Sequence, residues 1–168
     1  MGSQIHLMSE PGKGSTFSFE LEFEKGIKEN ITVDNNYNIE FVNRKNILLV
    51  EDNKINQMIT QKMLEKRGIT CKIIDNGEEA IEEVKNNHFD LILMDVHLPG
   101  INGTEATSEI RKFNHITPII ALTAISLNEN REMLLSYGMN EVITKPFEPE
   151  HFYNVVTKYL TSTEQSNS

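Results

Sequence analysis

Hydrophobic and polar residues follow two alternating patterns between residues 45 and 161. Continuously apolar runs such as "ILLV" and "LILM" are followed by stretches in which apolar residues recur every three or four positions. The first pattern is typical of strands buried on both faces, and the second of helices with one apolar face. Five such strand–helix units follow one another. The pattern therefore predicts an α/β fold with a doubly wound five-stranded parallel sheet.

Each predicted helix has an apolar face that we expect to pack against the sheet. After the first strand, Ile55, Ile59 and Met63 are spaced four residues apart. Gly68 then ends the helix. The faces of the later helices contain, in chain order, Ala80, Ile81 and Val84; Ile110 and Phe113; Met133, Leu134 and Tyr137; and Phe152, Val155, Val156, Tyr159 and Leu160.

The chain outside this region has a different pattern. Two strand-like runs, "QIHLMSE" and "STFSFELEFE", flank the turn "PGKG", which predicts a short β-hairpin within residues 1–24. A lone hairpin is marginally stable in water, so this hairpin requires a partner sheet. Residues 25–44 are polar and rich in Asn, which predicts a linker. Residues 162–168 are too polar to pack and predict a disordered tail.

Composition and charge exclude several classes of protein. Hydrophobic residues make up 38% of the chain and charged residues 24%, as in soluble globular proteins. A formal net charge of -9 disfavours binding to nucleic acid. The single cysteine, Cys71, excludes a disulfide framework, and we expect it to be a small buried residue. No signal peptide and no apolar run of about 18 residues is visible, so we expect a cytoplasmic location without direct membrane contact.

Polar residues with complementary chemistry follow four of the predicted strands. They are Glu51 and Asp52 after the first strand, Asp95 after the third, Thr123 at the end of the fourth and Lys145 at the end of the fifth. In open parallel sheets, ligands bind outside the carboxyl ends of the strands, where the strand order reverses. If the first strand is central and next to the third, all these side chains surround one crevice. Taken singly, each residue could instead be a turn former, a helix cap, a core hydroxyl or a surface lysine.

Three neighbouring carboxylates repel one another unless a cation lies between them. Mg²⁺ suits such a site, because it takes one or two protein carboxylates and fills its other positions with water and phosphate oxygens. Asp95 is the natural nucleophile, and its attack on phosphorus would give an aspartyl phosphate. Lys145 and Thr123 would bind oxygens of the transferred group, so that positioning and electrostatics supply most of the catalysis.

The segments "LLVEDNKINQ", "LILMDVHLPGING", "PIIALTA" and "ITKPF" resemble, in order and spacing, the receiver domain of two-component response regulators over residues 45–161. The resemblance implies the flavodoxin-like strand order 2-1-3-4-5 and phosphorylation of Asp95. It also implies that Asp52 and Asp95 bind Mg²⁺ directly and that Glu51 does so largely through water. The backbone carbonyl of His97 would be a further metal ligand.

The same resemblance assigns roles to the remaining site residues. Thr123 would be the switch hydroxyl, and Lys145 would bind the phosphate, with a cis peptide bond before Pro146. Many receivers have Tyr or Phe where this chain has Val142, so we expect no aromatic rotamer switch, although Thr123 could still move toward the phosphate. We expect the His97 side chain to face solvent; in the family, this position helps to set the lifetime of the aspartyl phosphate.

The "EDN…N" start resembles receivers that are fused to hybrid sensor histidine kinases, and residues 1–24 resemble the last two strands of a histidine-kinase ATP-binding domain. We therefore expect the chain to be the C-terminal part of a hybrid kinase whose membrane anchor, if any, lies elsewhere. Its partners would be the kinase domain of the parent chain and a histidine-phosphotransfer protein. The nucleotide-contacting boxes are absent, so we expect catalysis only of its own phosphoryl transfer and dephosphorylation.

Other functions are less compatible with the motifs. Haloacid-dehalogenase phosphatases have a second acid two residues after the nucleophile, where this chain has His97, and the glycine-rich loop of P-loop NTPases is missing. The histidines lack the spacing of zinc ligands. Only a short polar tail follows the last helix, which disfavours a DNA-binding regulator. The alternative that stays open is a receiver-like protein-interaction module that is not phosphorylated, although the full set of site residues disfavours it.

Overall fold

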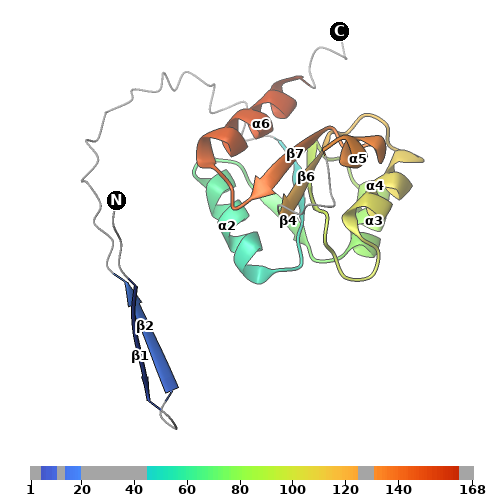
Figure 1. The fold of residues 1–168 in the computed structure, drawn as a ribbon. Helices are drawn as coiled ribbons and strands as arrows, with labels where there is room; N and C mark the ends of the chain where they lie inside the picture. The colour runs from blue at the N-terminus through green and yellow to red at the C-terminus, as the bar shows by residue number, and fades with distance from the viewer. Residues whose placement is uncertain (1–4, 11–13, 20–44, 125–130, 163–168) are drawn as a thin grey trace. The chain divides into compact units, whose positions relative to one another are not determined.

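The computed structural model describes residues 5–10, 14–19, 45–124 and 131–162 (Figure 1). The chain divides into two compact units, Met1–Asn35 and Asn36–Ser168. None of the helices within the described ranges combines the length and the apolar composition needed to cross a membrane.

The first unit contains the predicted hairpin. Strands β1 (Ile5–Glu10) and β2 (Gly14–Phe19) pair antiparallel, with Ile5 opposite Phe19 and Glu10 opposite Gly14. The rest of the predicted second strand, up to residue 24, lies outside the described residues, as does the predicted linker. The resemblance of residues 1–24 to a histidine-kinase ATP-binding domain stays a prediction.

The second unit is built around a parallel sheet in the order β4-β3-β5-β6-β7. The strands are β3 (Ile47–Val50), β4 (Cys71–Ile74), β5 (Leu91–Asp95), β6 (Ile119–Ala124) and β7 (Glu141–Lys145). Numbered within this unit, the order is 2-1-3-4-5, which confirms the predicted doubly wound fold. Strands β3 and β5 are buried along their whole length, as their continuously apolar sequences predict.

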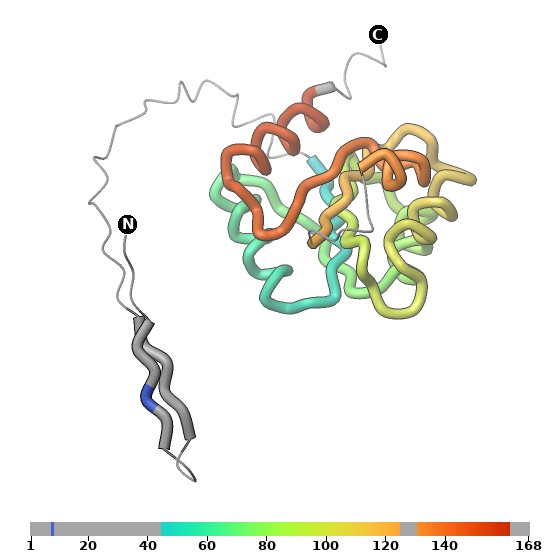
Figure 2. The backbone as a smooth tube through the Cα atoms, in the orientation of Figure 1, coloured from blue at the N-terminus to red at the C-terminus, as the bar shows by residue number. Residues whose placement is uncertain are grey.

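Helices cover both faces of the sheet. They are α2 (Lys54–Glu65), α3 (Gly77–Asn86), α4 (Gly103–Arg111), α5 (Arg131–Ser136) and α6 (Pro149–Ser162). Alternate residues of β3 point to opposite sides: Leu48 and Val50 join a core cluster with α3, α4 and α5, whereas Ile47 and Leu49 join one with α2 and α6. Figures 1 and 2 show these two groups of helices on either side of the sheet. Ser162 ends α6, and the rest of the predicted tail lies outside the described residues.

Three of the helices begin at an asparagine cap. The side chains of Asn53, Asn76 and Asn102 accept hydrogen bonds from backbone N–H groups in the first turns of α2, α3 and α4. Gly103 allows α4 to begin directly behind β5, because a Cβ atom there would lie only 2.0 Å from the Asp95 carbonyl oxygen. Both α2 and α4 therefore begin next to the polar strand ends.

The predicted apolar face of α2 is wrong in part. The side chains of Ile55 and Ile59 are 66% and 47% exposed, whereas Gln57 and Thr60 are buried together with Leu64. In the first turn of α2, Asn56 and Gln57 donate hydrogen bonds to Glu51 at the polar end of β3, so this side of the helix points inward. The Thr60 hydroxyl is buried as well but has no hydrogen-bond partner among the described residues. Only toward its C-terminal end does the helix contribute an apolar residue, Leu64, to the core.

Three smaller expectations also need correction. Phe113 and Tyr137 were expected inside but are 43% and 41% exposed. Each lies just beyond the end of its helix, so the helical spacing no longer governs where the side chain points. Cys71 is half-buried on the edge strand β4, and burial raises the pKa of its thiol to about 11. The remaining predicted inward residues of α3 to α6 are buried or pack against the two core clusters.

Candidate functional site

The strand register brings the predicted site residues to one edge of the sheet. Val50 pairs with Met94, so Glu51 follows β3 at the level of Asp95. Asp95 in turn pairs with Leu122, the residue before Thr123. Ala124, the residue after Thr123 on β6, pairs with Lys145 on β7. Because parallel strands end at the same edge, residues that are far apart in the sequence meet there.

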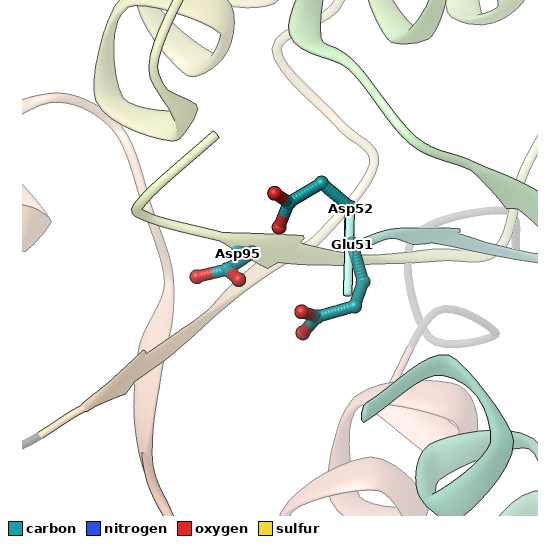
Figure 3. A group of neighbouring side chains, drawn as sticks. All are labelled: Glu51, Asp52 and Asp95. Atoms are coloured by element: carbon teal, nitrogen blue, oxygen red, sulfur yellow. The ribbon is translucent and has the colours of Figure 1, made fainter. Parts of the chain in front are cut away.

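Three carboxylates form the centre of this edge (Figure 3). Glu51, Asp52 and Asp95 each have an oxygen atom that lies within 4.8 Å of one from each of the others. Glu51 and Asp95 are buried, whereas Asp52 is exposed, so solvent reaches the cluster from the Asp52 side. The predicted acidic cluster is therefore present in the fold.

Lys145 joins two of these carboxylates. Its Nζ lies 2.5 Å from Oε2 of Glu51 and 2.8 Å from Oδ2 of Asp95, and its side chain is only 16% exposed. The peptide bond between Lys145 and Pro146 is cis, as the family resemblance implies. The ammonium group balances one of three negative charges, which leaves an excess that a divalent cation could balance.

The second carboxylate oxygen of Asp95 also has a hydrogen-bond donor. Its Oδ1 accepts a hydrogen bond of 3.1 Å from the backbone N–H of His97. The His97 side chain is exposed, which confirms that it faces solvent. The role of the His97 carbonyl as a metal ligand stays a prediction.

Thr123 lies at the same edge, near the end of β6. It is buried, and its hydroxyl donates a hydrogen bond of 2.9 Å to the backbone carbonyl of Ala124. Val142 pairs with Ala121 in the sheet and packs against the core beside α5. A small aliphatic residue thus occupies this position of β7.

Two residues around Glu51 were not anticipated from the sequence. Oε1 of Glu51 accepts a hydrogen bond of 2.9 Å from Nδ2 of Asn56, and its backbone carbonyl accepts one of 2.5 Å from Nε2 of Gln57. Burial raises the pKa of Glu51 above its usual value, although the hydrogen bonds from Lys145 and Asn56 act in the opposite direction. The available signal was the polar spacing of Asn53, Asn56, Gln57 and Thr60 along one side of the helix.

The donor set fits a hard divalent cation. Carboxylate oxygens are the ligands that Mg²⁺ prefers, and Mg²⁺ keeps several water molecules when few protein ligands are available. The exposed position of Asp52 leaves room for such waters on the solvent side. Thiolate or imidazole ligands, which zinc prefers, are not part of the group that the described residues form.

Comparison with known proteins agrees with this geometry. A model of the response regulator receiver domain family matches residues 47–157. The chain is 38% identical over 154 residues to the autoinducer 2 sensor kinase/phosphatase LuxQ of Vibrio vulnificus; the match covers 90% of this chain but only 18% of that protein. The chain thus spans about a fifth of the length of this curated relative.

Solved structures with similar folds include two receiver domains of known context. One is the receiver domain of the sensor histidine kinase PA1611 from Pseudomonas aeruginosa, with a magnesium ion coordinated in its active site cleft. It is 37% identical, with a TM-score of 0.65, and the match covers 70% of this chain and 98% of that chain. The other is the receiver domain of Ssk1 from Saccharomyces cerevisiae, crystallised with the histidine phosphotransfer protein Ypd1. It is 34% identical, with a TM-score of 0.63 and coverage of 68% and 88%.

Proposed function

This chain belongs to the response regulator receiver domain family, and from that premise we propose that Asp95 accepts a phosphoryl group in a phosphorelay. The observation that carries the proposal is the position of the Asp95 carboxylate. It lies at the end of a central strand, 2.8 Å from the ammonium of Lys145 and within the acidic cluster. A nucleophile held beside a cation is what transfer of an anionic group requires.

The transfer would start from a phosphohistidine. An oxygen of Asp95 attacks the phosphorus, the bond from phosphorus to the imidazole nitrogen breaks, and the imidazole leaves. Lys145 balances charge on the oxygens of the transferred group, and the Thr123 hydroxyl donates to one of them after turning away from the Ala124 carbonyl. Attack by water on the aspartyl phosphate would later release inorganic phosphate.

We further propose that Asp52 and Asp95 hold Mg²⁺, with Glu51 acting largely through water and the carbonyl of His97 as an additional ligand. When bound, the cation supplies positive charge to the phosphoryl oxygens. The support is the oxygen-only cluster, together with the magnesium ion in the similar receiver of PA1611.

The proposed partners are a histidine kinase domain, within a longer parent protein, and a histidine-phosphotransfer protein. Support comes from the kinase relative and from the receiver of Ssk1, which was crystallised with such a protein. Helix α2 begins next to Asp52 and exposes Ile55, Met58 and Ile59, an apolar patch of the kind that protein partners cover. We propose the cytoplasm as the location.

The test of the phosphoacceptor role is phosphorylation by a small-molecule donor. The chain is incubated with acetyl phosphate and Mg²⁺ and its intact mass is measured; we expect a gain of one phosphoryl group, absent in Asp95→Asn. An unmodified wild-type chain would support the alternative of a non-phosphorylated interaction module. A mass gain retained in Asp95→Asn would place the phosphoryl group elsewhere.

The metal site has a separate test. NMR titration with Mg²⁺ should give weak binding, on the order of millimolar, that Asp52→Ala abolishes. Glu82→Ala, which removes an exposed acid of α3, is the matched control and should bind Mg²⁺ as the wild type does. Equal binding by Asp52→Ala and the control would refute the ligand assignment.

A further inference from the structure

Glu51 is the most enclosed member of the acidic cluster. It has no exposed surface, and each of its two carboxylate oxygens accepts a hydrogen bond. Lys145 donates to Oε2, while the carboxamide of Asn56 donates to Oε1 at 2.9 Å. The backbone N–H of Asn53 adds a longer contact of 3.3 Å to Oε1. The orientation of the carboxylate therefore depends on Lys145 of β7 and on two donors at the start of α2, of which Asn56 makes the shorter contact.

Asn56 is well placed to act as a fixed donor. It lies in the first turn of α2, where its backbone N–H donates at 3.2 Å to the capping side chain of Asn53. The next residue, Gln57, donates to the backbone carbonyl of Glu51. One helical turn thus holds both the main chain and the side chain of Glu51. The cap itself uses Asn53, so the carboxamide of Asn56 is not needed to begin the helix.

We propose that Asn56 is a positioning residue that holds the Glu51 carboxylate in the orientation required by the cation. A glutamate side chain has more rotamers than an aspartate, and fixing it costs conformational entropy. A preformed hydrogen bond to a charged oxygen offsets that cost and keeps the buried carboxylate satisfied. This inference rests on the proposed function only in naming Mg²⁺ as the bound ion.

The first experiment is a Mg²⁺ titration followed by NMR. Asn56→Ala should weaken Mg²⁺ binding by about tenfold, since a hydrogen bond to a charged group is lost. Gln61→Ala is the matched control: it removes a carboxamide from the same helix, but Gln61 donates only to Glu65 in the described contacts. The control should change the affinity less than about twofold. Equal affinities of Asn56→Ala and the wild type would overturn the proposal.

A double-mutant cycle separates positioning from a general effect on the fold. Glu51→Asp keeps a carboxylate but shortens the side chain, so the oxygen moves away from Asn56. In that background, Asn56→Ala should change the Mg²⁺ affinity by less than about twofold. If Asn56→Ala weakened Mg²⁺ binding by the same factor in both backgrounds, Asn56 would act through something other than Glu51. Should Asn56→Ala fail to fold, Asn56→Ser supplies a shorter side chain; wild-type Mg²⁺ affinity in that variant would overturn the proposal.

Phosphorylation kinetics add a second readout. With acetyl phosphate as donor, Asn56→Ala should need about ten times more Mg²⁺ for half-maximal rate, while the rate at saturating Mg²⁺ stays within about twofold. A lower rate at saturation with an unchanged Mg²⁺ requirement would contradict the positioning role. If the wild type binds Mg²⁺ but gains no phosphoryl group, the proposed function fails and the titration still decides the role of Asn56.

Discussion

Helices α2 and α3 lie on opposite faces of the same sheet and begin at similar asparagine caps, yet they bury opposite kinds of residue. Helix α3 buries Ala80, Ile81 and Val84, whereas Glu78, Glu79 and Glu82 are exposed. The first two turns of α2 bury Gln57 and Thr60 instead. Its exposed face carries Ile55, Met58 and Ile59.

The difference between the two buried faces reflects what each helix contacts on the sheet. The inner face of α3 meets apolar strand residues, so transfer of its aliphatic side chains from water stabilises the fold. The first turns of α2 meet the polar end of β3, where Glu51 needs donors for its carboxylate and its carbonyl. Apolar residues on that side would leave those groups unsatisfied. The exposed apolar residues of α2 then need another explanation, and we propose contact with a partner.

The largest expected effect comes from placing a charge on the buried face of α3. Val84→Asp should lower the free energy of unfolding by about 3–5 kcal/mol, because an unpaired carboxylate would be buried in the core. Met58→Asp, on the exposed face of α2, should change it by less than about 0.5 kcal/mol. Urea unfolding followed by circular dichroism measures both. Similar losses in the two variants would remove the contrast between the helices.

The next effect concerns the exposed face of α2. Ile59→Asp should slow phosphoryl transfer from a phosphorylated histidine-phosphotransfer protein by about 30-fold, the loss of about 2 kcal/mol of binding. The rate with acetyl phosphate should stay within about twofold, because that donor needs no docking surface. Ile116→Asp, another exposed isoleucine, serves as the control. Equal slowing by both substitutions, or with both donors, would speak against docking on α2.

A smaller effect is expected on the buried face of α2. Gln57→Ala leaves the backbone carbonyl of Glu51 without its donor, which should cost about 1–3 kcal/mol of stability. Gln61→Ala removes the same group from the more exposed part of the helix and should cost less than about 0.5 kcal/mol. Thermal and urea unfolding give both values. A neutral result for Gln57→Ala would mean that the inward polar face contributes nothing to stability.

The smallest effect is a pH dependence of stability caused by Glu51, the buried acid beside α2. Burial raises the pKa of Glu51 in the folded chain above its value of 4.5 in the unfolded chain. As the pH falls from neutral toward 4.5, the folded state therefore takes up a proton at Glu51 before the unfolded state does. In Mg²⁺-free buffer the wild type should gain stability relative to Glu51→Gln over that range, and lose it again as the pH rises. Unfolding at several pH values measures the difference, and a relative loss of wild-type stability on acidification would contradict the prediction.

Much of the fold followed from sequence because its signals are local. Runs such as "LILM" have no polar face, which predicts central strands, and five strands separated by helical spacing allow few arrangements. The acids and the lysine that follow the strands lie at one edge of the sheet, because the carboxyl ends of parallel strands all lie there. The roles of Asn56 and Gln57 were not visible, because a polar helix position normally faces solvent.

By itself the sequence determined which segments are strands and helices, that the sheet is parallel, and which polar groups follow its strands. The elements and the parallel sheet follow from the periodicity of the chain, whereas the order of the strands was implied by the resemblance to the receiver family. Only the tertiary structure decided which face of α2 is buried and which neighbours hold Glu51. The reason is physical, because burial depends on what lies opposite a helix. Opposite the first turn of α2 lies the Glu51 carboxylate, and leaving it buried without hydrogen bonds would cost more free energy than burying the isoleucines would gain.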